Sequence, residues 1–410
     1  MESRVQSADK SKPRVAVVIH RFADDSGGGA EEYCRTLVRA LRETWELDVL
    51  TTCSKDHHRW TNDLAPGVEE RDGFRTIRFA VAHRKRRALS ALLGRVLPRI
   101  PHPRSLENIW LDALGPVSPG LLDHLRRSSG IYRAVIFLPY LYPTTVYGLP
   151  LAGPRTLLIP AAHDEPAIRS AAHRDALTRA GALAFLTPEE ADLVEGVIGR
   201  PARAKLLLGA ELEPQAWTPG DAESFRRKHG INGRFLLYLG RIERSKGLPA
   251  LFAMYESAPE RLPPLVLAGR LGPLRIPRWA RHVGFLSDEE KRGALAACEA
   301  LVQPSALESL SLVLLEAWAQ RRPAIVNGRC GPMAGQCSRS GGGLVFRSRD
   351  EFIAAVRALG DQARRAALGE CGHRYTRANH QPGCLRARLV PFLEGLGWTE
   401  SVRNAEVQIA

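Results

Sequence analysis

Two glutamates with seven residues between them, Glu308 and Glu316, lie in the apolar stretch 304–326. Glu308 precedes a helical pattern and Glu316 lies inside it, so about two helical turns separate the two carboxylates. A carboxylate can accept hydrogen bonds from two neighbouring sugar hydroxyls. The backbone N–H groups of residues 309–312, near the start of the helix, are free to bind phosphate oxygens.

A simpler interpretation makes Glu308 an acid at the helix start and leaves Glu316 facing solvent. The residues around Glu316 favour burial instead, because they are apolar and occupy several faces of the helix: Leu312, Val313, Leu315 and Trp318. The stretch therefore predicts a cradle for a sugar that is joined to a nucleotide through phosphate.

Two cations, Arg241 and Lys246, follow a predicted strand in the segment YLGRIERSKGL (238–248). Open α/β sheets bind ligands at the carboxyl ends of their strands, so these cations could clamp a diphosphate. Charge-assisted hydrogen bonds of this kind are each worth about 1.5–3 kcal/mol. A solvated basic loop is the alternative, but Gly240 and Gly247 flank the pair as if the backbone had to pass close to a ligand.

A glycine-rich loop, SGGGAEE (26–32), follows the first predicted strand. Glycines let the backbone approach a ligand, and the helix that starts after Gly29 offers N–H groups and a positive dipole end to an anion. Gly28 and Gly29 are therefore candidate phosphate contacts. The spacing is not G-x-G-x-x-G, which weakens the case for a dinucleotide-dependent oxidoreductase. A permissive turn between strand and helix is the alternative interpretation.

Short apolar runs predict the strands that must position these loops. In the first half they cover 14–20, 47–52, 134–138, 155–160 and 183–187, and in the second half 235–240, 264–269, 280–285, 300–305, 323–327 and 343–346. Helical patterns separate most of these runs, as a parallel sheet with crossover helices requires. The sequence therefore predicts an α/β fold with two Rossmann-like domains whose parallel sheets face each other across a cleft.

The length of the chain fits this division, since 410 residues suit two domains of roughly 150 to 200 residues each. We expect a flexible N-terminus over 1–13 and a first domain over 14–211. A segment with Pro214, Pro219 and Gly220 marks the hinge to a second domain over 212–385. The C-terminal segment, 386–410, is expected to cross back to the first domain.

Composition limits where the protein works. The seven cysteines are scattered without a C-x-x-C pair, which fits neither a disulfide framework nor a zinc site and favours a reducing cytosol. No apolar run approaches the roughly 20 residues that cross a bilayer, and the polar N-terminus does not resemble a signal peptide. We therefore expect a cytoplasmic protein.

The net charge of +14 and the pI of about 9.8 suggest acidic partners. Residues 84–104 contain seven Arg or Lys and no acid, interleaved with leucine, valine and isoleucine. This segment predicts either a solvated basic face whose apolar side packs on the core, or contact with an acidic acceptor or with an anionic membrane surface. Contact with a membrane would place the protein peripherally at the inner membrane face. Nucleic acid is a third partner, but no zinc-finger, RNP or basic-zipper pattern accompanies the segment, so it is not expected.

The order of four segments, GGGAE, GRIERSKG, ESLSLVLLE and RRPAIVNG, resembles glycosyltransferase family 4, the large retaining group with the GT-B fold. The resemblance covers nearly the whole chain and implies that two domains close on a nucleotide-diphosphate sugar bound mainly by the second. It implies that Arg241 and Lys246 hold the diphosphate and stabilise the leaving group. Glu316 would bind the ribose, Glu308 the hydroxyls of the donor sugar, and Gly29 the phosphate from the other domain.

The segment PAAHDEPAI (160–168) also matches a position of that family. The match implies that His163 faces the cleft near the sugar and the acceptor, with Asp164 and Glu165 orienting it or binding acceptor. Two aromatic residues at a strand end, Tyr140 and Tyr142, are further candidates for the acceptor side, although aromatic residues there are as often packing residues.

The resemblance also implies a mechanism. Retaining members commonly lack a well-placed nucleophile, and the acceptor hydroxyl attacks the face from which the diphosphate leaves, with the phosphate as base. Catalysis would rest on electrostatics and positioning by Glu308, His163, Arg241 and Lys246. No Asp-x-Asp motif stands at a suitable strand end, so we expect no metal and no cofactor beyond the nucleotide sugar. The acceptor would be a hydroxyl of a glycan, a lipid-linked sugar or a small molecule.

Two departures from the family pattern leave the donor open. Ser309-Leu310-Ser311 stands where Gly-Phe-Gly is common, so the serine hydroxyls are expected to contribute to phosphate binding, and Arg322 stands where glycine is common. Two other classes of function remain as alternatives. One is a GT-B nucleotide-sugar epimerase or phosphorylase, and the other is a non-catalytic basic protein that binds membrane or nucleic acid.

Overall fold

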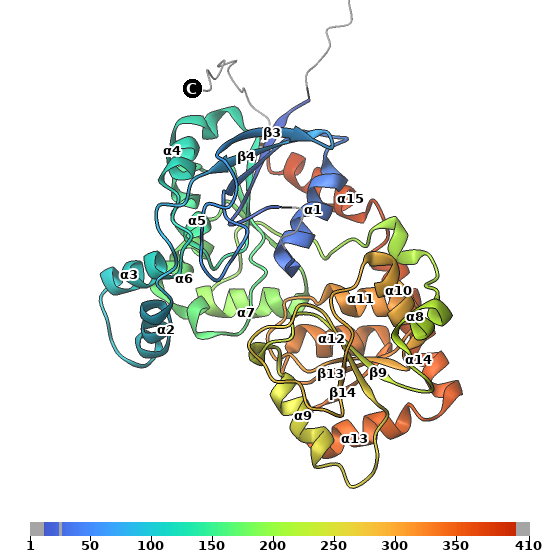
Figure 1. Cartoon of the computed structure of the whole chain (residues 1–410). Coiled ribbons are helices and arrows are strands. Elements are labelled where there is room, and N and C mark those ends of the chain that lie inside the picture. The colour runs from blue at the N-terminus through green and yellow to red at the C-terminus, as the bar shows by residue number, and fades with distance from the viewer. Residues whose placement is uncertain (1–11, 24–26, 399–410) are drawn as a thin grey trace, which may run out of the picture.

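The computed structural model describes residues 12–23 and 27–398, so the rest of the predicted N-terminal and C-terminal segments lies outside the described residues. Two α/β domains follow each other along the chain, each built on a largely parallel sheet with helices packed around it (Figure 1). This arrangement confirms the predicted fold class of two Rossmann-like domains.

The first domain is built on an eight-stranded sheet in the order β3-β4-β2-β1-β5-β6-β7-β8, in which only β3 runs antiparallel to its neighbour. Its strands are β1 (Arg14–Ile19), β2 (Glu46–Thr52), β3 (Gly67–Arg71), β4 (Phe74–Phe79), β5 (Ala134–Leu138), β6 (Thr156–Leu158), β7 (Ala182–Phe185) and β8 (Lys205–Leu207). Its helices are α1 (Gly29–Leu41), α2 (Arg87–Val96), α3 (Arg104–Leu114), α4 (Pro119–Ser128), α5 (Pro143–Val146), α6 (Ala171–Arg179) and α7 (Pro188–Ile198).

The second domain is built on a six-stranded parallel sheet in the order β11-β10-β9-β12-β13-β14, the Rossmann order 3-2-1-4-5-6. Its strands are β9 (Leu236–Leu239), β10 (Leu265–Ala268), β11 (Arg281–His282), β12 (Ala300–Gln303), β13 (Ala324–Asn327) and β14 (Gly343–Phe346). Its helices are α8 (Ala222–His229), α9 (Leu248–Glu256), α10 (Asp288–Ala297), α11 (Leu312–Ala319), α12 (Gly331–Ser340), α13 (Arg349–Ala358) and α14 (Gln362–Asn379).

Burial on both faces explains why the central strands appear in the sequence as continuous apolar runs. In β1, Val15 and Val17 enter a core cluster on one face of the sheet, whereas Ala16 and Val18 enter a second cluster on the other. The exposed edge strand β3 has the polar sequence GVEER and no apolar alternation, so it was not predicted. The predicted strand 280–285 is reduced to the two residues of β11.

The last helix of the described chain, α15 (Cys384–Gly395), returns to the first domain and packs near α1 (Figure 1). The Leu385 N–H donates to Glu211 Oε2 at 3.1 Å, and Arg388 Nη1 donates to the Leu208 carbonyl at 2.9 Å. Arg386 pairs with Glu43 at the end of α1. The helix thereby ties the end of the second domain to the first. Among the described residues, no helix is long and apolar enough to cross a membrane.

Candidate functional site

Lys246 and Glu308 form an ion pair at the carboxyl edge of the second sheet. Lys246 Nζ lies 2.7 Å from Glu308 Oε1, and both side chains are about one-fifth exposed. Lys246 ends the short turn after β9, and Glu308 lies between β12 and α11. Gly247, which has a φ of 77°, packs so closely against the Pro304 carbonyl that a Cβ would collide with it. This close approach joins the two loops, so a ligand can meet a cation and a carboxylate at one point.

The loop before α11 directs backbone N–H groups toward the same edge. Ser311 has a φ of 74° and is nearly buried, and its side chain makes no capping hydrogen bond with the helix. Within the described part of the chain, no acceptor is recorded for the N–H groups of residues 309–312. The Ser309 carbonyl accepts from Thr187 Oγ1 of the first domain at 3.1 Å. The loop with Ser309, Ser311 and Leu312 is therefore held at the domain boundary with donors available to an anion.

Glu316 lies one turn into α11 and pairs with Lys291 of α10, whose Nζ is 2.7 Å from Glu316 Oε1. Burial alone would lower the pKa of Lys291, but the carboxylates of Glu316 and Asp288 raise it above its ordinary value. The other carboxylate oxygen, Glu316 Oε2, is buried and has no hydrogen-bond partner among the described residues. A buried acceptor of this kind needs a donor, and a ribose hydroxyl would supply one.

Arg241 does not share a partner with Lys246. It reaches across to the first domain, where its Nη1 lies 3.1 Å from Nε2 of His57, and it also lies 3.4 Å from Glu243. Burial lowers the pKa of His57 to about 3, and nearby cations add to the effect. His57 is therefore neutral at ordinary pH and accepts the hydrogen bond from Arg241. The contact joins Arg241, a residue of the second domain that is predicted to bind the diphosphate, to a histidine of the first domain.

The glycine loop of the first domain also faces the second domain. A Cβ placed on Gly27 would lie 4.0 Å from Arg270 Nε, which follows β10. A Cβ on Gly28 would collide with the carboxylate of Glu31, whereas one on Gly29 would meet open space. Gly28 is thus required by packing inside its own domain, and Gly29 leaves the first turn of α1 accessible.

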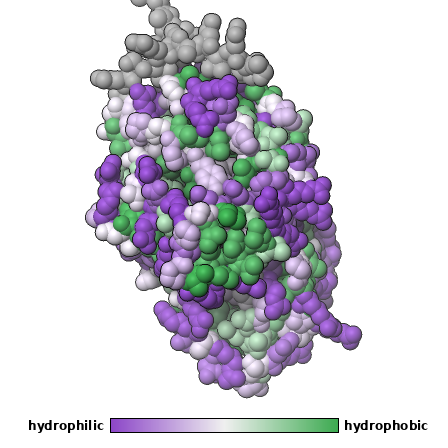
Figure 2. All heavy atoms as spheres, turned by 90° about the vertical axis from the view of Figure 1, so that its left-hand side faces the viewer, coloured by the Kyte–Doolittle hydropathy of each residue, from purple (hydrophilic) through white to green (hydrophobic). Residues whose placement is uncertain are grey.

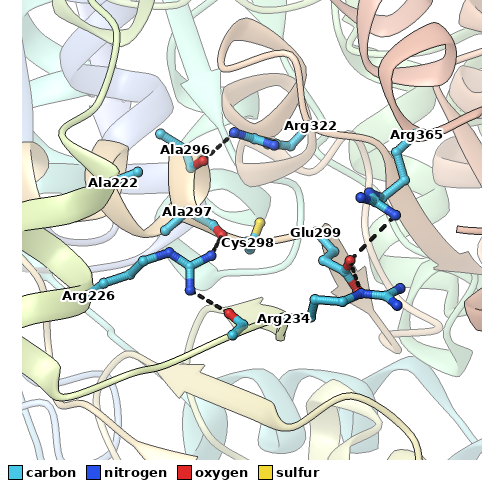
Figure 3. Close-up of a pocket in the computed structure, with 10 residues that line it drawn as sticks. Ala222, Arg226, Arg234, Ala296, Ala297, Cys298, Glu299, Arg322 and Arg365 are labelled. Carbon is cyan, nitrogen blue, oxygen red and sulfur yellow. Dashed lines mark hydrogen bonds and ion pairs between the residues drawn. The ribbon is translucent and has the colours of Figure 1, made fainter. Parts of the chain in front are cut away.

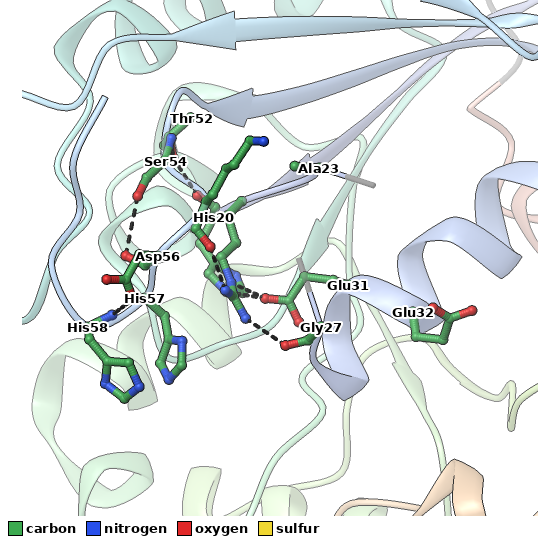
Figure 4. A network of polar contacts seen from close by, with 12 residues as sticks. His20, Ala23, Gly27, Glu31, Glu32, Thr52, Ser54, Asp56, His57 and His58 are labelled. Carbon is green, nitrogen blue, oxygen red and sulfur yellow. Dashed lines mark hydrogen bonds and ion pairs between the residues drawn. The ribbon is translucent and has the colours of Figure 1, made fainter. Parts of the chain in front are cut away.

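A buried network follows β1 and connects to this loop (Figure 4). His20 Nε2 lies 3.2 Å from Glu31 Oε1, and Arg21 also pairs with that carboxylate. Burial lowers the pKa of His20. Burial alone would raise the pKa of Glu31, but the hydrogen bond from His20 and the charge of Arg21 bring it to about 2. The His20 ring stacks on Tyr142, with centroids 3.9 Å apart.

The predicted acceptor-side residues are brought together only in part. Tyr140 donates to Glu165 Oε1 at 2.9 Å, and His163 Nδ1 lies 3.7 Å from the same oxygen. Burial alone would raise the pKa of Glu165, but its contacts with His163 and Tyr140 lower it. Tyr142 belongs to the His20 network instead. Asp164 is mostly exposed and pairs with Arg169 at 2.7 Å, away from this group.

One cluster of described residues could place three ligand atoms around a metal ion: Asp56, His57 and His58. The His57 and His58 rings lie 3.8 Å apart, and both residues belong to the loop after β2 (Figure 4). However, His57 Nε2 already accepts from Arg241, and Arg21 and Lys85 also contribute positive potential there. These cations oppose the binding of a further cation.

A separate cavity of about 500 Å³ lies at the opposite, amino edge of the second sheet (Figure 3). Its arginines have structural partners. Arg226 Nη2 donates to the Ala297 carbonyl at 2.6 Å, Arg322 donates to the Ala296 carbonyl, and both carbonyls end α10. Arg234 and Arg365 pair with Glu299. Helix carboxyl ends favour cations. We therefore infer that these arginines stabilise the fold, including Arg322, which stands where glycine was expected.

Several residues of the site were not predicted, chiefly His20, Arg21, His57 and Lys291. The positions of three of these residues could have indicated them, since His20 and Arg21 directly follow β1 and His57 lies shortly after β2. The carboxyl ends of parallel strands are the usual place for functional residues. Lys291 gave no such signal, because it lies inside α10 and reaches Glu316 only through helix packing.

Two solved structures share the fold of nearly the whole chain. A sucrose-phosphate synthase from Thermosynechococcus elongatus superposes with a TM-score of 0.71 at 19% identity, over 95% of this chain and 100% of that one. HepE from Anabaena, solved in complex with UDP-glucose, superposes with a TM-score of 0.64 at 13% identity, over 94% and 99% of the two chains. The chain therefore has the two-domain GT-B architecture.

The sequence comparisons then identify the second domain. Residues 221–373 match the family model described as glycosyl transferases group 1, so this part of the chain is a group 1 glycosyltransferase domain. A D-inositol 3-phosphate glycosyltransferase from Corynebacterium urealyticum is 28% identical over 237 residues, which cover 51% of this chain. The match spans about half of that relative, 55% of its length. Both findings support the prediction that the chain is a glycosyltransferase enzyme.

Proposed function

We propose that this protein is a retaining glycosyltransferase of family 4, which moves a sugar from a nucleotide-diphosphate sugar to an acceptor hydroxyl. The observation that carries the proposal is the ion pair of Lys246 and Glu308, beside the N–H groups at the start of α11, which have no acceptor among the described residues. Glu316 lies farther along that helix, and one of its carboxylate oxygens has no hydrogen-bond partner in the part of the chain that the structure describes. The spacing suits phosphate at the helix start and ribose beyond it.

The same residues support a front-face reaction. As the bond between the anomeric carbon and the phosphate oxygen breaks, the acceptor oxygen forms a bond to that carbon on the same face, and its proton passes to the departing phosphate. Lys246 and Arg241 would stabilise the negative charge that develops on the diphosphate. Glu308 would hold the sugar by its hydroxyls, and His163, oriented by Glu165, would lie toward the acceptor.

A ligand screen followed by product analysis tests this proposal. The purified chain would be scanned for thermal stabilisation by nucleoside diphosphates and their sugars, since a ligand bound only by the folded state raises Tm. The donor that stabilises it would then be incubated with sugar, lipid-linked and small-molecule acceptors. A new glycoside with the anomeric configuration of the donor is expected. Free epimerised sugar, or a product that requires inorganic phosphate, would instead indicate an epimerase or a phosphorylase.

We also propose that transfer needs no metal ion. The cations Arg241 and Lys246 would take the place of a metal at the diphosphate. Dialysis against EDTA is expected to leave the turnover unchanged, and added Mg²⁺ or Mn²⁺ is expected to raise it less than about twofold. Loss of turnover with EDTA, restored by one of these ions, would contradict this expectation.

His57 is expected to position Arg241. His57→Ala should raise the KM for the donor about 10-fold with a smaller change in kcat, because a neutral hydrogen bond to a charged group is worth roughly 1.5 kcal/mol or more. His57→Gln should restore most of the loss, since its amide oxygen can also accept from Arg241. The exposed neighbour His58→Ala is the control. If all three variants have the KM of the wild-type protein, the contact between His57 and Arg241 does not matter for donor binding.

We further propose a cytoplasmic location. All seven cysteines are free, and five are buried, which suits a reducing compartment.

A further inference from the structure

An exposed apolar patch lies on the helical pair α2–α3 at the side of the first domain. Figure 2 shows this face, with apolar residues gathered at its centre and hydrophilic residues around them. Four aliphatic side chains are 36–58% exposed: Leu92, Val96, Ile100 and Ile109. Leu92 and Val96 stand one turn apart in α2, and Ile100 follows the short turn η1 (Leu97–Arg99). These residues face outward, so they do not belong to the core of the domain.

Cations surround the patch, and most of them have no acidic partner among the described residues. Exposed arginines precede α2 and continue through it to the start of α3: Arg84, Arg86, Arg87, Arg95, Arg99 and Arg104. Arg104 pairs with Asp175 at 3.5 Å and with Glu107 at 3.8 Å, but the other five have no carboxylate partner among the described residues. The sequence has no Asp or Glu between Asp72 and Glu107. The patch therefore combines apolar surface with an uncompensated positive charge.

The patch is fixed to the body of the domain. Glu107 in α3 accepts hydrogen bonds from the N–H groups of Ala171 and Ala172 at the start of α6, at 2.9 and 2.7 Å. Trp110 Nε1 donates to the Ser90 carbonyl at 3.1 Å, which joins α3 to α2. Helix α6 follows the loop of His163 and Glu165 along the chain. A surface bound by the patch would therefore be held close to the predicted acceptor side.

We propose that the α2–α3 patch docks the protein on an anionic lipid surface. Aliphatic side chains enter the boundary of the acyl chains while neighbouring arginines meet anionic headgroups, which is how amphipathic surface helices bind membranes. A nucleic acid would satisfy the arginines but leave four aliphatic side chains against phosphate, and single strands are held by stacking on aromatic rings. A second copy of the chain would place like charges against each other.

Vesicle binding by the full chain tests the proposal without requiring transfer activity. The wild-type protein is expected to sediment with phosphatidylglycerol-containing vesicles but not with vesicles of phosphatidylcholine alone. Each arginine near the surface contributes about fivefold to binding at low salt. A variant with Arg84, Arg86, Arg87 and Arg95 replaced by glutamine should therefore bind anionic vesicles about 600-fold more weakly at low salt. A matched variant with four exposed arginines of the second domain replaced, Arg227, Arg261, Arg275 and Arg278, should bind like wild type.

A second variant tests the apolar centre. Leu92→Asn combined with Ile100→Asn keeps every charge and should weaken vesicle binding about 10-fold at physiological salt, because less apolar surface enters the membrane. Both positions are exposed, so the fold should persist, as an unchanged Tm would verify. Equal vesicle binding by the two patch variants and wild type would overturn the proposal. So would displacement from vesicles by single-stranded RNA at equimolar phosphate. Stabilisation by nucleoside diphosphates, measured in parallel, reports separately on the proposed donor site.

Discussion

Replacing Lys246 with alanine is expected to reduce sugar transfer about 100- to 1000-fold, the range found when one preorganised stabilising group is removed from a reaction centre. Lys246 Nζ lies 2.7 Å from Glu308, so a bound donor would place its phosphate–sugar junction at this pair. The lysine would stabilise the charge that grows on the leaving diphosphate, which affects the transition state more than the bound donor. The loss should therefore appear mainly in kcat.

The control for Lys246→Ala is Arg244→Ala. Arg244 lies on the same short turn, η6 (Arg244–Lys246), and is exposed with no ion pair among the described residues. The substitution Arg244→Ala removes one positive charge from the same turn, as Lys246→Ala does, but should leave turnover unchanged. Lys246→Ala should shift the free energy of unfolding by only about 1 kcal/mol, because its ion pair is partly exposed to water. Unchanged turnover with a correctly folded Lys246→Ala protein would remove the diphosphate assignment.

The central strands of both sheets could be predicted because burial on two faces leaves a clear trace in the sequence. Val15 to Ile19 and Leu236 to Leu239 are apolar at every position, and such runs indicate parallel strands. The polar strand β3 leaves no such trace. It is stabilised by pairing with β4 at the edge of the sheet, a contact that no local pattern in GVEER indicates.

The sequence could indicate which residues belong to the site, but not which of their side chains contact each other. The positions of Lys246 and Glu308 at strand ends indicated function, but their contact depends on how closely Gly247 approaches Pro304. The contact of Arg241 with His57 depends on how the two domains sit against each other, which no local pattern records. The aliphatic residues interleaved with arginines in 84–104 indicated an amphipathic segment, but only the fold shows that Leu92 and Val96 face outward.

Replacing Glu316 with glutamine is expected to weaken binding of the bare nucleoside diphosphate by about 1–3 kcal/mol, the cost of losing a hydrogen bond to a charged acceptor. Glu316 Oε2 is buried and has no partner within residues 12–23 and 27–398, while Oε1 accepts from Lys291. In Glu316→Gln the amide oxygen can still accept from Lys291, but the amide nitrogen cannot accept from a ribose hydroxyl. Isothermal titration with the nucleotide found in the ligand screen would measure the loss.

Asp288→Asn is the matched control for Glu316→Gln, because Asp288 also pairs with Lys291, at 3.2 Å, but is largely exposed at the start of α10. If the carboxylate of Glu316 binds ribose, only Glu316→Gln should lose nucleotide affinity. If Glu316 serves only to neutralise the buried Lys291, its variant should lower the free energy of unfolding and leave nucleotide affinity unchanged. Because binding and unfolding are measured separately, the two roles of this carboxylate can be distinguished even where both contribute.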